Sequence, residues 1–482
     1  MDVRDAYAIR NAVNARTISA REVAETALGR IEAVDGKLAA FLTCEPEQVL
    51  ARADAIDRKV KDGPLPLAGV PIAVKDNLCT RGLRTTCASK MLENWIPPYD
   101  ATAVEKLAAA GAIVVGKTNC DEFAMGSSTE NSAFKTTRNP YDLERIPGGS
   151  SGGSAVAVAA GMATLALGSE TGGSVRQPAS FCGITGLKPT YGRISRYGLV
   201  AYASSLDCVA PMGSSPRDVA LLLAQVAGQD AHDSTSSTMP VPDYESEMSR
   251  PMKGMRIGIT REFFGEGLNS EVKSAIETGI RNVESLGCEL VDVSLPHTPY
   301  VIADYYIIAT AEAGSNLARY DGVKYGYRAD APRDLLDMYQ RTRSTGFGAE
   351  VRRRIMIGTY ALSSGYYDAY YGRAMKVRTL IKRDYDLAFE KVDALISPVS
   401  PTPAFRIGEK SSDPLSMYLS DVYTVAANLA GIPGISIPCG FTRDGLPIGV
   451  QFLGAQFQEG ALLRLAQGYL DAFKPASPAL KV

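Results

Sequence analysis

Apolar and polar residues alternate through the first 62 residues with the period of amphipathic helices. Ser19 stands three residues before Glu22 at the start of one such stretch, which predicts a helix with a capping box. Its apolar positions share one face: Val23, Ala27, Leu28, Ile31 and Val34. We expect this helix to end near Gly36, and the same spacing predicts another helix over 49–60.

From residue 68 onward, short apolar strands alternate with helices, which is typical of an α/β architecture. The expected strands are 69–75, 112–116, 255–260, 288–293, 393–396 and 434–437. The expected helices are 101–110 with Asp100 as its N-cap, one that opens at Ser215-Pro216, 270–286 and 459–473. Residues 300–392 are mostly helical, rich in Tyr and Arg, and interrupt this alternation.

Composition and charge narrow the class of protein. The 482 residues are 45% hydrophobic and 22% charged, which are the proportions of an ordinary globular protein and exclude a disordered or collagen-like chain. The 51 basic and 53 acidic residues give a net charge of -2, so no large basic surface is expected. Any RNA partner is therefore expected to be held mainly by another protein of a complex.

The cysteine pattern and the N-terminus predict a cytoplasmic protein. None of the eight cysteines forms a C-x-x-C pair, which is typical of a reducing compartment and argues against a zinc site. The first 16 residues carry charges where a signal peptide needs an apolar stretch. No apolar segment approaches the roughly 18 residues of a spanning helix. The longest candidate, 155–168, is rich in Ala and Gly and is expected to be a closely packed buried element.

Two clusters of glycine and serine carry the most distinctive chemistry. They cover 147–154 (PGGSSGGS) and 168–178 (GSETGGSVRQP), with one expected helix and strand between them. Such clusters place many backbone N–H groups and hydroxyls close together. They are compatible with three kinds of site: a phosphate-binding loop, a serine nucleophile with a histidine base, or a serine nucleophile with another base.

The first two kinds of site lack a necessary residue. A phosphate-binding loop requires Lys after its second glycine, and Ser154 stands there instead. A nucleophile elbow around Ser150 requires a histidine base. The chain has two histidines, His232 and His297, and both fall in polar loop segments. We therefore interpret them as solvated loop residues.

A desolvated lysine is the usual substitute when a serine nucleophile has no histidine. Lys75 ends an apolar expected strand in the segment Val-Lys-Asp-Asn, where burial would favour its neutral form. To act as a base near neutral pH, its pKa would have to fall from about 10.4 to about 7 or 8. A structural lysine at a strand end is the alternative interpretation of the same residue.

Taken together, these motifs resemble the amidase signature family, whose core is a serine, cis-serine and lysine triad. Lys75, Ser150 in GGSSGG and Ser174 in GGSVR match that pattern in order and spacing, and 181–190 is also similar. The resemblance covers essentially the whole chain. It implies an amidase-signature fold, in which helices cover both faces of a central mixed β-sheet. It also implies a single domain over 1–482, with an N-terminal helical region at 1–62 and a helical insertion at 300–392.

Within that family, three segments resemble the glutaminase subunits of the aspartyl/glutamyl-tRNA amidotransferases: 121–132, 188–193 and 361–371. The resemblance implies hydrolysis of the glutamine side-chain amide, without a metal or cofactor in this chain. It also implies two partner subunits, one large and one small and helical. The large subunit is expected to bind tRNA, ATP and Mg²⁺ and to amidate Glu-tRNA(Gln), Asp-tRNA(Asn) or both. Two alternatives remain, a stand-alone amidase acting on another small amide and a non-catalytic relative.

The resemblance also assigns the site residues. Ser174 is the expected nucleophile, and Ser150 is expected to relay its proton to Lys75. The expected oxyanion hole is the set of backbone N–H groups of four consecutive residues: Thr171, Gly172, Gly173 and Ser174. For glutamine, Arg354 is expected to bind the α-carboxylate and Asp421 the α-ammonium, with Tyr305 lining the pocket. We expect Ser151 and Ser154 to satisfy backbone groups or cap the next helix, and Arg352 and Arg353 to lie on the surface.

Overall fold

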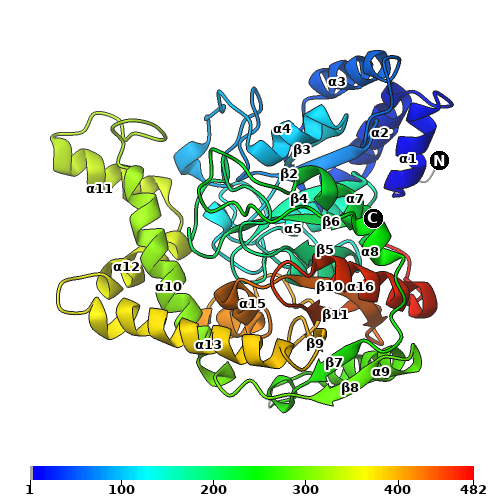
Figure 1. Cartoon of the computed structure of the whole chain (residues 1–482). Helices are drawn as coiled ribbons and strands as arrows, with labels where there is room; N and C mark the ends of the chain where they lie inside the picture. The colour runs from blue at the N-terminus through cyan, green and yellow to red at the C-terminus, as the bar shows by residue number, and fades with distance from the viewer. Residues whose placement is uncertain (1–3, 266) are drawn as a thin grey trace.

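The computed structural model describes residues 4–265 and 267–482. Within them, eleven strands form one mixed sheet in the order β1-β3-β2-β4-β6-β5-β10-β11-β9-β7-β8 (Figure 1). The strands are β1 Phe41–Thr43, β2 Pro71–Lys75, β3 Ile113–Thr118, β4 Leu165–Glu170, β5 Thr185–Lys188, β6 Cys208–Gly213, β7 Arg256–Ile259, β8 Glu289–Asp292, β9 Ala394–Pro398, β10 Gly434–Phe441 and β11 Pro447–Leu453. Strand β2 runs parallel to both neighbours, whereas the sheet from β4 through β11 to β9 is antiparallel. This is the α/β class that the sequence predicted.

Every residue of β2, β3, β4 and β6 is buried. A strand buried at successive positions has both of its faces covered, because its side chains alternate between the two faces of the sheet. The helices packed against these central strands include α5 (Gly152–Ala159), α7 (Pro216–Val226) and α4 (Thr102–Ala109). The apolar runs predicted at 69–75 and 112–116 are therefore central strands, whereas those at 255–260 and 288–293 form β7 and β8 at one edge of the sheet.

The N-terminal residues form three helices, α1 (Ala6–Asn14), α2 (Ala20–Leu38) and α3 (Pro46–Lys59). The capping box of Ser19 and Glu22 is present at the start of α2, as predicted. The helix continues two residues beyond Gly36 and ends where Ala39 adopts a left-handed conformation and its N–H donates to the carbonyl of Asp35. The end predicted near Gly36 was short by two residues, and Leu38, which lies beyond it, is buried in the core.

The predicted N-cap of α4 was also wrong. Ala101 occupies the capping position and makes no side-chain hydrogen bond to the helix. The Asp100 carboxylate instead accepts a hydrogen bond at 2.7 Å from the backbone N–H of Arg81, in a loop distant in sequence. The remaining α-helices outside residues 300–392 are α6 Arg176–Phe181, α8 Tyr244–Met248, α9 Ser270–Ser285, α14 Pro414–Tyr418, α15 Val425–Ala430 and α16 Glu459–Phe473.

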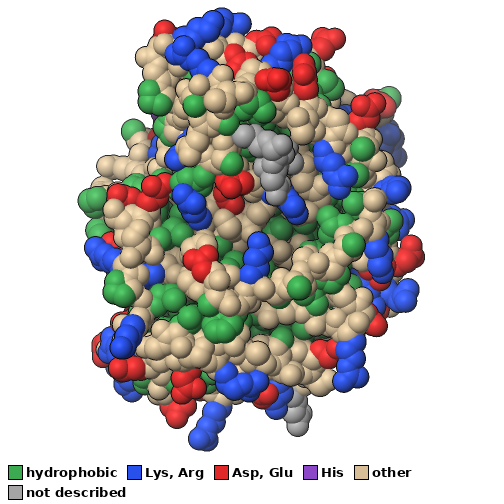
Figure 2. Space-filling model, turned by 90° about the vertical axis from the view of Figure 1, so that its right-hand side faces the viewer, with side chains coloured by type: hydrophobic (Ala, Val, Ile, Leu, Met, Phe, Trp, Pro, Cys, Tyr) green, Lys and Arg blue, Asp and Glu red, His purple; other side chains and the backbone are tan. Residues whose placement is uncertain are grey.

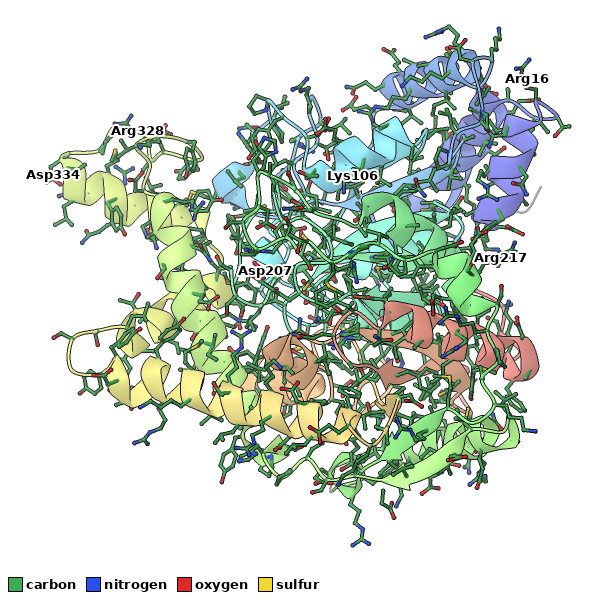
Figure 3. All side chains as sticks on the ribbon, viewed as in Figure 1. Arg16, Lys106, Asp207, Arg217, Arg328 and Asp334 are labelled. Carbon is green, nitrogen blue, oxygen red and sulfur yellow. The ribbon has the colours of Figure 1, made fainter. Side chains whose placement is uncertain are left out.

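The predicted helical stretch at 300–392 contains α10 (Val301–Asn316), α11 (Leu335–Gly346), α12 (Ala349–Ala361) and α13 (Arg373–Phe389). These helices lie to one side of the sheet in Figure 1, and the apolar residues of α10, α12 and α13 belong to a second core cluster. Figure 3 shows Arg328 and Asp334 at the outer tip of this region, near α11, and Asp207 in the middle of the molecule. The α11 end of this helical region therefore lies away from the middle of the molecule.

The surface agrees with the balanced charge of the sequence. On the face shown in Figure 2, basic and acidic side chains are interspersed with apolar ones, and neither sign gathers into one large patch. Among the described residues, no helix is long and apolar enough to cross a membrane.

Candidate active site

Lys75 lies at the carboxyl end of β2 and is completely buried. Its Nζ donates hydrogen bonds to Ser150 Oγ at 2.7 Å, to Ser151 Oγ at 2.9 Å and to the carbonyl oxygen of Ser169 at 3.2 Å. An ammonium group has three hydrogens, so these contacts account for all of them. The amine is therefore held in one position against two serine hydroxyls.

Burial lowers the pKa of Lys75 to about 8, because a desolvated ammonium is disfavoured. The carboxylates of Asp121, Asp207 and Glu170 oppose this shift through their negative charge. The contacts of Nζ are to neutral oxygens, so none of these groups forms an ion pair that would hold the proton on the amine. Lys75 is therefore able to lose and regain a proton near neutral pH.

Ser150 and Ser151 end a tight loop before α5. The Gly149–Ser150 peptide bond is cis. A side chain on Gly149 would overlap with the carboxylate of Asp121, which accepts hydrogen bonds from the backbone N–H groups of Thr129 and Asn131. This close packing against residues 121–131 explains why glycine precedes Ser150.

The two neighbouring serines behave differently from each other. Ser151 occupies the N-cap position of α5 but makes no capping hydrogen bond. Its hydroxyl contacts Lys75 and the backbone of Ser169, so it satisfies a backbone group as predicted and also touches the lysine, which was not predicted. Ser154 lies one turn into the helix, where its hydroxyl pairs with that of Thr118 at 2.7 Å.

Ser174 lies in the loop that joins β4 to α6. Its carbonyl oxygen accepts a hydrogen bond at 3.0 Å from the backbone N–H of Ser151, which holds the two glycine-rich loops together. Ser174 is 8% exposed, whereas Lys75 and Ser150 are fully buried. Of these three residues, Ser174 is the one that a molecule arriving from solvent reaches.

The N–H groups of this loop fall into two sets. Those of Val175 and Arg176 both donate to Glu170 Oε2 at 3.0 Å. Those of residues 171–174 donate to no acceptor within the part of the chain that the structure describes. Unpaired N–H groups are rare in protein interiors, so these four, which include that of Ser174 itself, are candidate donors to the oxygen of a bound molecule.

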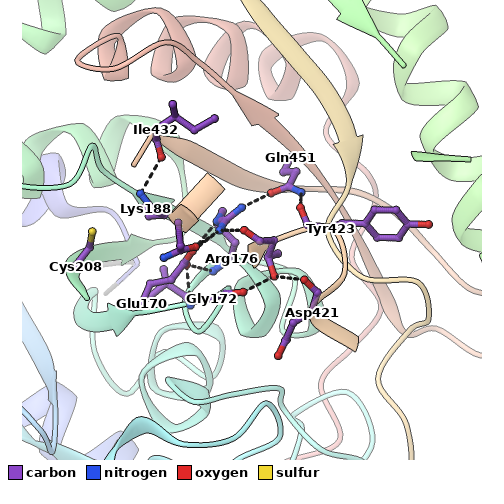
Figure 4. A network of polar contacts seen from close by, with 12 residues as sticks. Glu170, Gly172, Arg176, Lys188, Cys208, Asp421, Tyr423, Ile432 and Gln451 are labelled. Atoms are coloured by element: carbon purple, nitrogen blue, oxygen red, sulfur yellow. Dashed lines mark hydrogen bonds and ion pairs between the residues drawn. The ribbon is translucent and has the colours of Figure 1, made fainter. Parts of the chain in front are cut away.

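Buried groups support this loop from behind (Figure 4). The guanidinium of Arg176 contacts Glu170 and also donates to Gln451 Oε1 at 2.7 Å and to the carbonyl of Thr424 at 2.8 Å. The loop glycines are closely packed: a side chain on Gly172 would overlap with the ring of Tyr305, and one on Gly173 with the hydroxyl of Thr424. Tyr305 therefore lies against the loop.

Asp207 connects this loop to Arg354. Its carboxylate accepts hydrogen bonds from Thr171 Oγ1 at 2.6 Å and from the backbone N–H of Tyr202 at 2.9 Å. The Tyr202 hydroxyl in turn accepts a hydrogen bond from Arg354 Nη1 at 2.8 Å. Burial raises the pKa of Asp207 to about 6, while its hydrogen bonds act in the opposite direction.

Arg354 is the member of the three-arginine run that points inward. Arg352 and Arg353 are exposed, whereas Arg354 is buried. Its guanidinium forms an ion pair with Glu350 at 2.8 Å and lies 5.3 to 5.7 Å from the ring centres of three tyrosines: Tyr202, Tyr306 and Tyr418. An aromatic cage of this kind stabilises a buried cation and fixes its orientation.

Asp421 contacts Tyr306, one of the three tyrosines of this cage. Its Oδ2 accepts hydrogen bonds from Ser127 Oγ at 2.5 Å and from Tyr306 Oη at 3.4 Å. Burial raises the pKa of Asp421 to about 7, and Arg354 acts in the opposite direction. The site therefore presents a buried cation and a buried acid that both contact Tyr306.

Sequence reasoning missed several residues of this site: Ser127, Tyr202, Asp207, Tyr306 and Thr424. Ser127 belongs to the segment 121–132 that had been singled out, and Tyr306 directly follows Tyr305, so both had a local signal. The other three act through contacts with residues far away in the chain, for which the sequence offers no periodic pattern.

Comparison with known proteins agrees with this arrangement. A family model described as Amidase matches residues 22–463. A glutamyl-tRNA(Gln) amidotransferase subunit of Carboxydothermus hydrogenoformans is 60% identical over 473 residues, which is 97% of each chain. The crystal structure of a glutamyl-tRNA(Gln) amidotransferase subunit from Thermotoga maritima is 45% identical, with a TM-score of 0.78 over 93% of this chain and 90% of that one. A peptide amidase bound to the competitive inhibitor chymostatin is 31% identical, with a TM-score of 0.84 over 99% of both chains. These matches extend over nearly the whole chain, which therefore belongs to the amidase family.

Proposed function

We propose that this chain is the glutaminase subunit of a tRNA-dependent amidotransferase, acting in the cytoplasm. The observation that carries the proposal is the pair formed by Arg354 and Asp421, which both contact Tyr306 and are linked to the loop of Ser174 by hydrogen bonds. A buried cation and a buried acid in one site match the carboxylate and ammonium of a free α-amino acid. The 60% identity to a glutamyl-tRNA(Gln) amidotransferase subunit supports glutamine as that amino acid.

In the proposed reaction, Ser174 Oγ attacks the side-chain amide carbon of glutamine. A C–O bond forms, and the serine proton passes through Ser150 to neutral Lys75. The same path then returns a proton to the amide nitrogen, the C–N bond breaks, and ammonia leaves. A glutamyl ester remains on Ser174, and water hydrolyses it to glutamate. The 2.7 Å contact between Lys75 Nζ and Ser150 Oγ supports the second half of this relay.

The negative charge that develops on the amide oxygen needs fixed donors. We assign this role to the backbone N–H groups of 171–174, which have no acceptor inside the described residues. Such donors cost no reorganisation during the reaction, because the loop is already fixed by its contacts with Glu170 and Thr424.

The released ammonia requires an acceptor, and we assign it to partner subunits. Because amidation of a carboxylate carried by tRNA requires activation by ATP, we assign ATP, Mg²⁺ and tRNA to a large partner subunit. A small helical subunit completes the proposed complex. The names of the relatives, which describe one subunit of an amidotransferase, support this assignment. The acceptor is Glu-tRNA(Gln), Asp-tRNA(Asn) or both, and the partner determines which.

A stand-alone amidase is the second candidate, because the chain also resembles a peptide amidase over its full length. The test is glutamate release from glutamine by the purified chain, alone and after co-expression with the partner subunits. We expect release that depends on the partners. Hydrolysis of unrelated amides by the chain alone, without glutaminase activity in the complex, would instead identify a stand-alone amidase.

Replacing Asp421 by asparagine tests the recognition of glutamine. We expect KM for glutamine to rise by about 10- to 100-fold with a smaller change in kcat, because charge-assisted hydrogen bonds are worth roughly 1.5–3 kcal/mol. Glutaramate is glutamine without its α-amino group, so it makes no contact between an ammonium and Asp421. The parent protein and Asp421→Asn should therefore hydrolyse glutaramate equally well. Steady-state kinetics with the two substrates measures the difference.

Asp413→Asn is the matched control for this variant, since Asp413 caps α14 eight residues earlier and its replacement retains a capping side chain. Its KM should be that of the parent protein. If Asp421→Asn impaired glutamine and glutaramate to the same extent, Asp421 would not bind the α-ammonium.

A further inference from the structure

Thr424 lies directly before α15 and is fully buried against the loop of Ser174. Its hydroxyl donates to the carbonyl oxygen of Gly172 at 2.6 Å and lies 3.0 Å from the carbonyl oxygen of Asp421. A side chain on Gly173 would overlap with this same hydroxyl. The contact therefore joins the middle of the loop to the segment that carries Asp421.

We propose that Thr424 is a positioning residue that sets the orientation of the Gly172–Gly173 peptide, so that the Gly173 N–H points at the oxygen of the substrate amide. The proposal rests on the function proposed above. In a trans peptide, the carbonyl oxygen and the N–H point in opposite directions from one rigid plane. A hydrogen bond that holds the Gly172 carbonyl on the Thr424 side therefore directs the Gly173 N–H to the opposite side.

The loop requires such a constraint because glycine, which has no side chain, restricts its own backbone angles very little. Gly173 has φ of +137°, a region that other residues rarely adopt, and two successive glycines rotate more freely than any other pair. Glu170 fixes the far end of the loop through the N–H groups of Val175 and Arg176. Thr424 provides the corresponding contact in the middle.

Thr424 is itself held firmly, as a positioning residue must be. Its backbone N–H donates to the carbonyl of Asp421 at 2.9 Å, and its own carbonyl accepts from Arg176 Nη2 at 2.8 Å. Figure 4 labels three of the residues that these contacts involve, Gly172, Arg176 and Asp421. Because threonine is branched at Cβ, its χ1 angle is also restricted. The hydroxyl therefore has one well-defined position.

The expected effect is on the transition state more than on binding. The amide oxygen is neutral in bound glutamine and becomes negative only as Ser174 attacks, so a misdirected donor costs most at that stage. Loss of the Thr424 hydroxyl should therefore lower kcat and leave KM nearly unchanged. Removal of a whole oxyanion donor costs about 10²–10³ in kcat, and a misaligned donor should cost about 10- to 100-fold.

The experiment compares Thr424→Val, which keeps the shape and loses the hydroxyl, with Thr424→Ser, which keeps the hydroxyl. Both are measured in the intact complex for kcat and KM with glutamine. We expect Thr424→Val to lose kcat with KM changed by less than about threefold, and Thr424→Ser to retain most of the activity. Thr185→Val is the matched control, because this buried threonine lies on β5, outside the site.

An aldehyde analogue of glutamine gives a second reading, because its adduct with Ser174 carries the oxyanion. Its affinity should fall in Thr424→Val in parallel with kcat, while the affinity for glutamate should not change. If Thr424→Val fails to fold, as judged by circular dichroism, Thr424→Ala is compared with Thr424→Ser in its place.

Two results would overturn the proposal. A rise in KM with unchanged kcat would show that Thr424 acts only on Asp421. Equal losses of kcat in Thr424→Val and Thr424→Ser would show that Thr424 acts only through packing. If the parent complex hydrolyses a different amide and not glutamine, the proposed substrate is wrong, and the same comparison made with that amide still decides the role of Thr424.

Discussion

Replacing Ser174 by alanine is expected to abolish amide hydrolysis, with a loss of at least about 10⁴ in kcat, because the acyl group then has no atom to bond to. Water alone would have to attack the amide, and the loop N–H groups would assist it only weakly. The measurement is release of ammonia and glutamate by the intact complex. Mass spectrometry of the parent protein, quenched during turnover, should also find a glutamyl adduct that the variant lacks.

Ser154→Ala is the matched control for this prediction. It removes a buried serine hydroxyl from the other glycine-rich cluster, 147–154, and that hydroxyl pairs with Thr118 and not with Lys75. It should lower thermal stability slightly and leave turnover unchanged. Full activity in Ser174→Ala, with the glutamyl adduct still present, would show that another residue is the nucleophile and would contradict the proposed mechanism.

Replacing Lys75 by methionine is expected to lower kcat by about 10²–10⁴, the usual contribution of a general base. Methionine fills a similar volume without an amine, so the two serine hydroxyls lose the group that accepts the proton. The pH profile provides a second measurement. Because burial places the pKa of Lys75 at about 8, its neutral fraction rises through that pH, and kcat/KM of the parent protein should rise up to about pH 8 and then level off.

Lys188→Met is the matched control, since Lys188 is equally buried and donates to the carbonyls of Pro189 and Ile432 at 2.9 and 2.8 Å. It should lower the melting temperature without changing the pH profile. Residual activity of Lys75→Met that still rose through pH 8 would assign the titration to another group and remove Lys75 from the relay.

The local structure was largely predictable from the sequence. The capping box at Ser19 and the closing helix α16 over Glu459–Phe473 were confirmed, and so were the predicted strands that became β2 and β3. These features depend on residues that are neighbours in the chain, such as a cap three residues from its partner or apolar positions at a regular period. The end predicted near Gly36 was two residues short, at a turn that neighbouring residues form, whereas the N-cap predicted at Asp100 was wrong because that carboxylate binds the backbone of Arg81.

The motifs likewise identified the elements of the site before their geometry was known. Lys75, Ser150 and Ser174 lie in short signatures whose order and spacing are visible in the sequence. The structure adds what the spacing does not contain: Lys75 contacts Ser150 across 75 positions and also contacts Ser151. It also shows that Ser174 is the one of the three that is open to solvent.

The sequence by itself therefore determined the fold class, the family resemblance and the reactive residue types. Only the tertiary structure decided which distant groups meet. Ser127 contacts Asp421 across 294 positions, and Thr424 contacts Gly172 across 252. The physical reason is that caps and periodicity are set by neighbours in the chain, whereas burial, pKa and the direction of a hydrogen bond depend on what the folded chain packs against each group.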